Sequence, residues 1–291
     1  MSRIEKVLEK AAEIRESAQG GAAEKPVTTD SRIPFAGFEI GEPAANPDKS
    51  YSHLICLTDP NSLFAEQYKK LRARILKATA TNFLNTIMVT SPGAGEGKTI
   101  TAINLAISIA SEIDYTVLLV DTDLKRPSIH KYLGIETEYG LSDCLTGKAE
   151  LSHVMIKTGI GKLVFLPAGN AMENAAELLS SERMKMLVNE MKHRYKDRYI
   201  IFDSSPLLLT SDAIPLSNYM DGVLLVIQAS RTTPKDASLA VSQIKGSNIL
   251  GVVFNNVPKY LAANLYPYYH LYEKEGYYQK AQDSKEIENN R

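Results

Sequence analysis

Residues 93–99 combine three glycines with a lysine and a threonine, a set of residues that can hold phosphate. The segment reads Gly-Ala-Gly-Glu-Gly-Lys-Thr and follows a short apolar run. Glycine lets backbone N–H groups turn inward around phosphate oxygens, and a following helix adds the positive end of its dipole. Lys98 would reach the β- and γ-phosphates, and the Thr99 hydroxyl would bind Mg²⁺. The predicted nucleotide-binding residues are Gly93, Ala94, Gly95, Glu96, Gly97, Lys98, Thr99 and Ile100.

This segment departs at one position from the P-loop pattern G-x-x-x-x-G-K-[ST]. Pro92 stands where the pattern has its first glycine. The strand-like run before the segment and the amphipathic helical pattern after it supply the context that a P-loop requires. The alternative is a glycine-rich turn between a strand and a helix that holds no ligand.

Two further segments place carboxylates at the ends of strand-like runs. Asp121 and Asp123 follow one run, and Asp203 ends another. Ligands of an open α/β sheet bind at the carboxyl ends of its strands, where a P-loop also lies. We therefore expect the three carboxylates to converge on the phosphates, with one of them holding Mg²⁺ directly or through water. The alternative is that these residues cap helices or form turns.

A parallel sheet is needed to bring these segments together, and the sequence predicts one. The strand-like runs are short and continuously apolar, as in strands that are covered on both faces. They lie at Thr86–Ser91, Thr116–Asp121, Leu163–Pro167, Tyr199–Asp203, Gly222–Gln228 and Leu250–Asn255. Helical patterns lie at Ser62–Thr79, Gly97–Glu112, Ser181–Lys196, Ser211–Tyr219 and Pro234–Lys245. The predicted fold class is α/β, a P-loop NTPase three-layer sandwich with a mostly parallel central sheet flanked by helices.

The composition argues against several other classes of protein. The 291 residues include 33 Lys+Arg and 34 Asp+Glu, and this net charge of −1 gives no overall attraction for nucleic acid. The two cysteines lack metal-ligand spacing and fit a reducing compartment. The longest apolar runs are strand-sized, far below the ~20 residues of a membrane-spanning helix. We expect a cytoplasmic protein that neither binds nucleic acid nor spans the membrane.

The motifs resemble those of the bacterial tyrosine kinases, which are P-loop proteins unrelated to eukaryotic protein kinases. The resemblance covers residues 60–275, with Walker A at 91–99, Walker A′ at 117–125, Walker B at 199–203, and further similar segments at 176–181 and 211–213. Lys125 stands where the family commonly has arginine. The resemblance implies an ATP- and Mg²⁺-dependent protein-tyrosine kinase. It assigns catalysis to Lys98, Asp121, Asp123 and Asp203, and metal binding to Thr99, Asp123 and Asp203. Asp121 would help to remove the tyrosine proton.

Tyrosines are concentrated near the C-terminal end of the sequence. Seven of the 15 lie between residues 260 and 278. The resemblance implies that this segment is the autophosphorylation site, with the phosphorylated residues Tyr266, Tyr268, Tyr269, Tyr272, Tyr277 and Tyr278. Each phosphate would add about −1.5 to −2 charges, enough to separate neighbouring subunits. The alternative is an interaction tail that is not phosphorylated.

The predicted helix over 62–79 carries charged residues at every third position. Glu66, Lys69 and Arg72 lie on one face, and they resemble the E-x-x-R-x-x-R oligomerisation motif of the same family with lysine in place of the first arginine. We expect them to contribute to a homo-oligomer in which each tail enters a neighbouring active site. The alternative is an ordinary solvated helix face with a salt bridge.

The sequence suggests four parts. They are an amphipathic helix at 1–18, a flexible linker at 19–58, the kinase domain at 59–257 and the tyrosine-rich tail at 258–291. The opening residues resemble the soluble autokinases encoded with exopolysaccharide export systems. That resemblance implies regulation of exopolysaccharide synthesis and export. It also implies a membrane-bound polysaccharide chain-length regulator that activates the kinase and recruits it to the inner face of the plasma membrane, and a tyrosine phosphatase as a further partner.

Two other functions are compatible with a P-loop. One is a ParA- or MinD-like ATPase that acts as a nucleotide-switched dimer. Such proteins typically carry a lysine five residues before the P-loop lysine, and Gly93 occupies that position here. The other is a nucleotide-binding scaffold without catalysis, which the acidic residues at 121 and 203 argue against.

Overall fold

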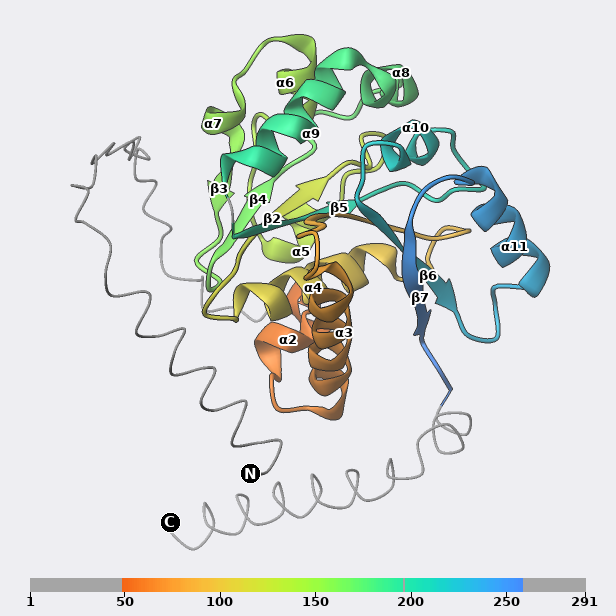
Figure 1. Cartoon of the computed structure of the whole chain (residues 1–291). Coiled ribbons are helices and arrows are strands. Elements are labelled where there is room, and N and C mark those ends of the chain that lie inside the picture. Colours follow the sequence, from red (N-terminus) through yellow and green to blue (C-terminus); the bar gives the residue numbers. More distant parts are fainter. Residues whose placement is uncertain (1–48, 196, 259–291) are drawn as a thin grey trace, which may run out of the picture. The chain divides into compact units, whose positions relative to one another are not determined.

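Seven strands form one central sheet in the computed structural model, which describes residues 49–195 and 197–258 (Figure 1). They are β1 (Thr86–Thr90), β2 (Thr116–Asp121), β3 (Ile156–Lys157), β4 (Leu163–Leu166), β5 (Arg198–Asp203), β6 (Gly222–Gln228) and β7 (Ile249–Asn255). Their order is β3-β4-β2-β5-β1-β6-β7, and each neighbouring pair is parallel except β3 with β4. This topology confirms the predicted fold class.

Helices cover both faces of the sheet, as Figure 1 shows. They are η1 (Lys49–His53), α2 (Ile55–Thr58), α3 (Leu63–Thr79), α4 (Lys98–Ala110), α5 (Ile129–Leu133), α6 (Leu141–Thr146), α7 (Leu151–Val154), α8 (Ala175–Ser180), α9 (Glu182–Arg194), α10 (Ala213–Ser217) and α11 (Pro234–Gln243). The core on one face is built with α3, α4 and α5, and the core on the other face with α6 to α11. The sheet is therefore the middle of three layers.

Successive residues of each strand face opposite helix layers, because side chains alternate along a strand. In β1, Ile87 and Val89 pack in the cluster under α4, whereas Met88 packs in the cluster on the other face. All five residues of β1 and all six of β5 are buried. This double burial explains why the strands are continuously apolar in sequence.

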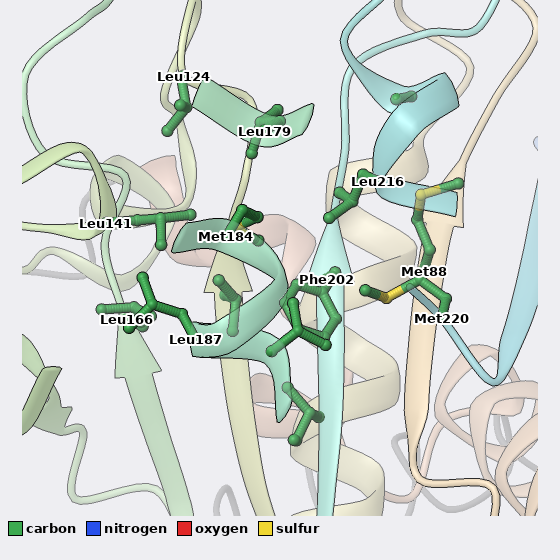
Figure 2. Close-up of a cluster of buried hydrophobic side chains, with 14 of the residues drawn as sticks. Met88, Leu124, Leu141, Leu166, Leu179, Met184, Leu187, Phe202, Leu216 and Met220 are labelled. Atoms are coloured by element: carbon green, nitrogen blue, oxygen red, sulfur yellow. The ribbon is translucent and has the colours of Figure 1, made fainter. Parts of the chain in front are cut away.

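Figure 2 shows the buried cluster on the α9 side of the sheet. Met184 and Leu187 of α9 point toward Leu166 of β4 and Phe202 of β5. Met184, Leu166 and Phe202 are fully buried. Burial of side chains of this size is worth roughly 1.5–3 kcal/mol each. The packing therefore fixes the strand that carries Asp203.

The sequence does not predict β3, α2 or the helices α5 to α8. These helices are four to six residues long, too short to show a helical period. Packing fixes them instead, as in α6, where Leu141, Cys144 and Leu145 are buried. The helix predicted at Ser211–Tyr219 is also shorter in the structure, where α10 spans Ala213–Ser217.

The sequence predicts a flexible linker over 19–58, but residues 49–58 are part of the packed domain. Leu54 is fully buried, and the backbone N–H of Cys56 donates to Asn104 Oδ1 in α4 at 2.9 Å. Asn104 Nδ2 in turn donates to the backbone oxygen of His53 at 2.9 Å. The Tyr51 hydroxyl donates to the backbone oxygen of Leu133 in α5 at 3.2 Å. The folded domain therefore begins before residue 59. The helix predicted at 1–18, the linker residues 19–48 and the tail from 259 lie outside the described residues.

We expect Leu54→Ala to lower the free energy of unfolding by about 2–5 kcal/mol, because the change leaves a cavity in the core under α4. Urea denaturation of the purified chain measures this difference. Leu57→Ala is the matched control, since Leu57 is 38% exposed three residues away. Equal losses for the two variants would show that the segment at 49–58 is not packed as described.

Candidate active site

The glycine-rich segment predicted to bind phosphate lies between the end of β1 and the start of α4. Gly95 and Gly97 have φ values of +75° and +91°, in the left-handed region that favours glycine. A Cβ at Gly97 would lie 1.9 Å from Asn255 Nδ2, so only glycine fits there. Gly97 is also the N-terminal boundary residue of α4, and it leaves the first N–H groups of this 13-residue helix without a side-chain cap. Such N–H groups bind phosphate.

Glu96 is buried within the same segment and ties it to two other elements. Its Oε2 accepts the backbone N–H of Gly93 at 3.0 Å, and its Oε1 accepts the Thr232 hydroxyl at 2.5 Å. The backbone oxygen of Glu96 accepts Asn255 Nδ2 at 2.9 Å. Glu96 is one of the predicted nucleotide-binding residues, but its side chain faces partners within the protein. It therefore shapes the loop from within.

Lys98 lies between two of the three predicted carboxylates. Its Nζ is 3.2 Å from Asp123 Oδ2 and 3.8 Å from Asp203 Oδ1. It also donates to the Thr99 hydroxyl at 3.2 Å. Burial works against its charge, but the carboxylates of Asp203, Asp123 and Asp121 raise the pKa of Lys98 above its usual value. The lysine is therefore a protonated cation held at the mouth of the loop.

The sheet register explains why the acidic residues meet. β2 and β5 are parallel neighbours, and Asp121 lies directly beside Asp203. Just beyond the strands, the Thr122 N–H and hydroxyl both donate to the backbone oxygen of Asp203, at 2.9 and 2.6 Å. These bonds join the two acidic strand ends into one rigid unit.

Asp121 is buried and faces the start of α5. Its Oδ2 accepts the backbone N–H groups of Ser128 and Ile129, each at 3.1 Å, and its Oδ1 accepts that of Asp123 at 3.2 Å. Burial and the nearby Asp203 raise the pKa of Asp121 to about 7, against the opposing effect of the two N–H groups on Oδ2. A carboxylate offers about four acceptor sites, so one remains for a proton.

Asp203 is fully buried, and neither of its carboxylate oxygens has a hydrogen-bond partner among the described residues. Burial raises the pKa of Asp203 to about 6, although Lys98 favours its charged form. Buried carboxylate oxygens normally have partners, so this pair calls for a cation or a metal-bound water. The residues present therefore fit Mg²⁺. Within the described residues no three acidic, histidine or cysteine side chains could enclose a metal by themselves, as expected where phosphates supply the other oxygens.

Lys125, at the position where the family commonly has arginine, forms an ion pair within the chain. Its Nζ lies 3.0 Å from Asp212 Oδ1, and the Asp212 side chain is only 2% exposed. Arg126, the next residue, is exposed. The pair connects the loop after β2 to the residues just before α10, so Lys125 holds these two segments together in the isolated chain.

The three charged residues of α3 make contacts within the chain. Glu66 and Lys69 pair with each other at 3.4 Å. Arg72 pairs with Glu112 at 2.6 Å and donates to the backbone oxygen of Ser108 at 2.8 Å, close to the end of α4. These are the contacts expected from the alternative interpretation, a helix face with salt bridges. Their role in oligomerisation remains a prediction.

Two residues of the site have no signal in the sequence. Thr232 and Asn255 reach Glu96 across 136 and 159 positions, and both lie at or after the ends of strands. The six tyrosines predicted to be phosphorylated lie outside the described residues. Along the part that the structure describes, no helix has the length and apolar character of a membrane span.

Comparisons with known proteins agree with this geometry. A family model described as "AAA domain" matches residues 84–245. The chain is 36% identical over 205 residues to the tyrosine-protein kinase YwqD of Bacillus subtilis, covering 70% of this chain and 85% of that protein. The kinase domain of the Escherichia coli tyrosine kinase ETK superposes with a TM-score of 0.67 at 31% identity, covering 71% of this chain and 80% of that one. The septum site-determining protein MinD of Pyrococcus horikoshii, solved with Mg-ADP, gives 0.50 at 23% identity over 61% of this chain and 75% of that one, a likeness in fold alone.

Proposed function

The chain belongs to the bacterial tyrosine-kinase family, and from this premise we propose that it transfers the γ-phosphoryl group of ATP to tyrosines of its own C-terminal tail, in trans. The observation that carries the proposal is the meeting of Lys98, Asp121, Asp123 and Asp203 beside the glycine-rich loop. Phosphoryl transfer requires a cation that binds the phosphates. It also requires carboxylates that hold a metal ion and accept a proton.

In the proposed reaction, Lys98 leaves its carboxylate partners to bind the β- and γ-phosphates. Thr99, Asp123 and Asp203 would hold Mg²⁺, which neutralises charge on the phosphates during transfer. The tyrosine oxygen forms a bond to the γ-phosphorus while the bond to the ADP oxygen breaks. A phenol with a pKa of about 10 attacks poorly, so a base is required. Asp121 accepts the phenolic proton.

Regulation forms the second part of the proposal. Phosphates on Tyr266, Tyr268, Tyr269, Tyr272, Tyr277 and Tyr278 would repel one another across neighbouring subunits and dissociate the assembly. A membrane-bound polysaccharide chain-length regulator would activate and recruit the kinase, and a tyrosine phosphatase would reset it. The family resemblance supports these roles and the link to exopolysaccharide export.

Mixing two defective variants tests phosphorylation in trans. The first is Lys98→Met with an intact tail, and the second has phenylalanine at the six tail tyrosines and an intact site. Each alone should show no tail phosphotyrosine by mass spectrometry after incubation with Mg-ATP. The mixture should label the tail of the Lys98→Met chain. Sedimentation before and after labelling of the wild-type chain reports whether phosphate dissociates the assembly, and an unchanged mass would contradict that part.

Two other outcomes would contradict the proposal. Wild-type chain that labels its tail while the mixture stays unlabelled would mean phosphorylation within one chain. No labelling in any sample, even with the activator's cytoplasmic segment added, would favour the nucleotide-switched ATPase. The fold shared with MinD keeps that second function open, whereas Gly93 at the position of the signature lysine argues against it.

A further inference from the structure

The loop between β6 and α11, residues 229–233, carries an arginine directly against the glycine-rich segment. A Cβ at Gly95 would lie 3.1 Å from Arg231 Nη1, so the guanidinium lies over the space that a side chain at this glycine would occupy. Arg231 is exposed, and Nη1 also donates to Gln228 Oε1 at 3.2 Å. Among the residues that the structure describes, no carboxylate lies within 4 Å of this guanidinium. Its charge therefore faces the phosphate-binding segment without an ionic partner.

The loop is held in place by bonds to both of its neighbours. The Thr232 hydroxyl donates to the buried Glu96 carboxylate at 2.5 Å and accepts the Gln228 N–H at 2.9 Å. The Ala229 N–H donates to the backbone oxygen of Asn255 at 2.9 Å. Ser230 has a φ of +62°, a conformation that non-glycine residues adopt only where the surroundings impose it. These contacts set the direction in which residue 231 leaves the loop.

Glu96 has one donor on each carboxylate oxygen, the Gly93 N–H and the Thr232 hydroxyl. One buried carboxylate therefore fixes the glycine-rich segment and the β6–α11 loop to each other. Movement of either would leave a buried charge without a hydrogen bond, which is costly. The arginine and the phosphate-binding backbone are consequently positioned as one unit.

We propose that Arg231 binds the phosphate chain of the nucleotide as a second cation beside Lys98, and that Thr232 positions it through Glu96. The inference rests on the proposed function of the same site. A guanidinium presents five donors in a planar fork that matches phosphate oxygens, and only one nitrogen is engaged by Gln228. Lys98 forms ion pairs with two carboxylates, which it must leave to bind a phosphate. Arg231 has no carboxylate partner among the described residues, so it can bind a phosphate without breaking an ion pair.

Calorimetric titration of the full chain with ADP and with a non-hydrolysable ATP analogue, both with Mg²⁺, tests the binding role. Arg231→Ala should weaken both ligands about tenfold, because a charge-assisted hydrogen bond is lost. Arg231→Lys should recover part of the affinity, since it restores charge but not the fork. The weak binding of adenosine, which lacks phosphate, should be unchanged.

Lys235→Ala is the matched control for charge. Lys235 is an exposed cation at the start of α11, four residues further along, and its removal should change affinity less than twofold. Equal losses in Arg231→Ala and Lys235→Ala would show a general field effect and overturn the proposal, as would wild-type affinity in Arg231→Ala. Weaker binding of phosphotyrosine alone, with nucleotide affinity intact, would assign Arg231 to the product instead and also overturn it.

A double-mutant cycle tests the positioning role of Thr232. Thr232→Val should weaken ADP several-fold in the wild-type chain and have little further effect in the Arg231→Ala chain. Fully additive losses of ADP affinity in the double variant would overturn the positioning role of Thr232. Thermal melting of each variant checks that the proteins compared are folded. Wild-type chain that binds no nucleotide would contradict the proposed function itself, and this inference with it. That result is distinct from a wild-type chain that binds nucleotide equally well without Arg231.

Discussion

Asp121→Asn is expected to slow tail phosphorylation by about 10³-fold, the middle of the range for loss of a general base. Asparagine cannot accept the phenolic proton, but its oxygen can still accept the N–H groups of Ser128 and Ile129 that bind Asp121 Oδ2. We therefore expect the variant to stay folded and to bind ADP with nearly wild-type affinity. Initial rates of phosphotyrosine formation by quantitative mass spectrometry, with saturating Mg-ATP, measure the effect.

Asp221→Asn is the matched control for this change. Asp221 also accepts backbone N–H groups, those of Asn85 and Thr86, but it precedes β6 at the opposite end of the strands from the phosphate loop. Its replacement should reduce stability and leave the rate per folded molecule within about twofold. A rate for Asp121→Asn within tenfold of wild type would mean that another group removes the proton.

Asp203→Asn should make the metal-free protein more stable at pH 8, by up to about 3 kcal/mol, although it removes a predicted Mg²⁺ ligand. Burial raises the pKa of Asp203 from 3.8 to about 6, so ionising it costs the folded state more than the unfolded chain. Stability is therefore lost as pH rises from about 4 to about 6, and the loss persists above that. Asparagine does not ionise, so the Asp203→Asn variant avoids this loss of stability. Urea denaturation at pH 4 and pH 8 measures the difference in stability between the two proteins, which should be small at pH 4 and largest at pH 8.

Two further measurements complete this test. Mg-ADP should stabilise the wild type and have much less effect on Asp203→Asn, since the variant has lost a predicted metal ligand. Asp221→Asn should show the opposite sign at pH 8. Although burial works the other way, hydrogen bonds from Lys192 and Thr86 lower the pKa of Asp221, so its charge stabilises the fold. An Asp203→Asn variant that is less stable than wild type at pH 8 would show that its ionised form is favoured by the fold.

Much of the fold could be predicted because its signals are local. Strands buried on both faces are continuously apolar, and the glycine-rich segment marks the passage from β1 to α4. The meeting of Asp121 and Asp203 also follows from local facts, since each residue ends a strand and parallel strands end on the same side of a sheet. Once β2 and β5 are neighbours in the sheet, the two residues lie side by side.

The remaining parts depend on contacts between distant segments. The helix α6 has six residues and is fixed by the burial of Leu141 and its neighbours. A helix this short shows no helical period in the sequence, so it could not be predicted. The predicted linker boundary is wrong for a related reason: Leu54 opens an apolar run of only four residues, 54–57, which is too short to show a helical period. Only its burial in the cluster with α4 shows that it is part of the core. Glu96 reads as an ordinary P-loop position, and its partner Thr232 is 136 residues away.

The grouping of one lysine with three carboxylates has a consequence for the form in which nucleotide enters. When all are ionised, Lys98, Asp121, Asp123 and Asp203 carry a net charge of −2 at one end of the sheet. Such a field repels a bare polyphosphate and attracts a divalent cation. We therefore expect the site to favour the magnesium complex of a nucleotide over the free anion. Binding of the nucleotide should then depend on the concentration of free magnesium separately from the total concentration of nucleotide.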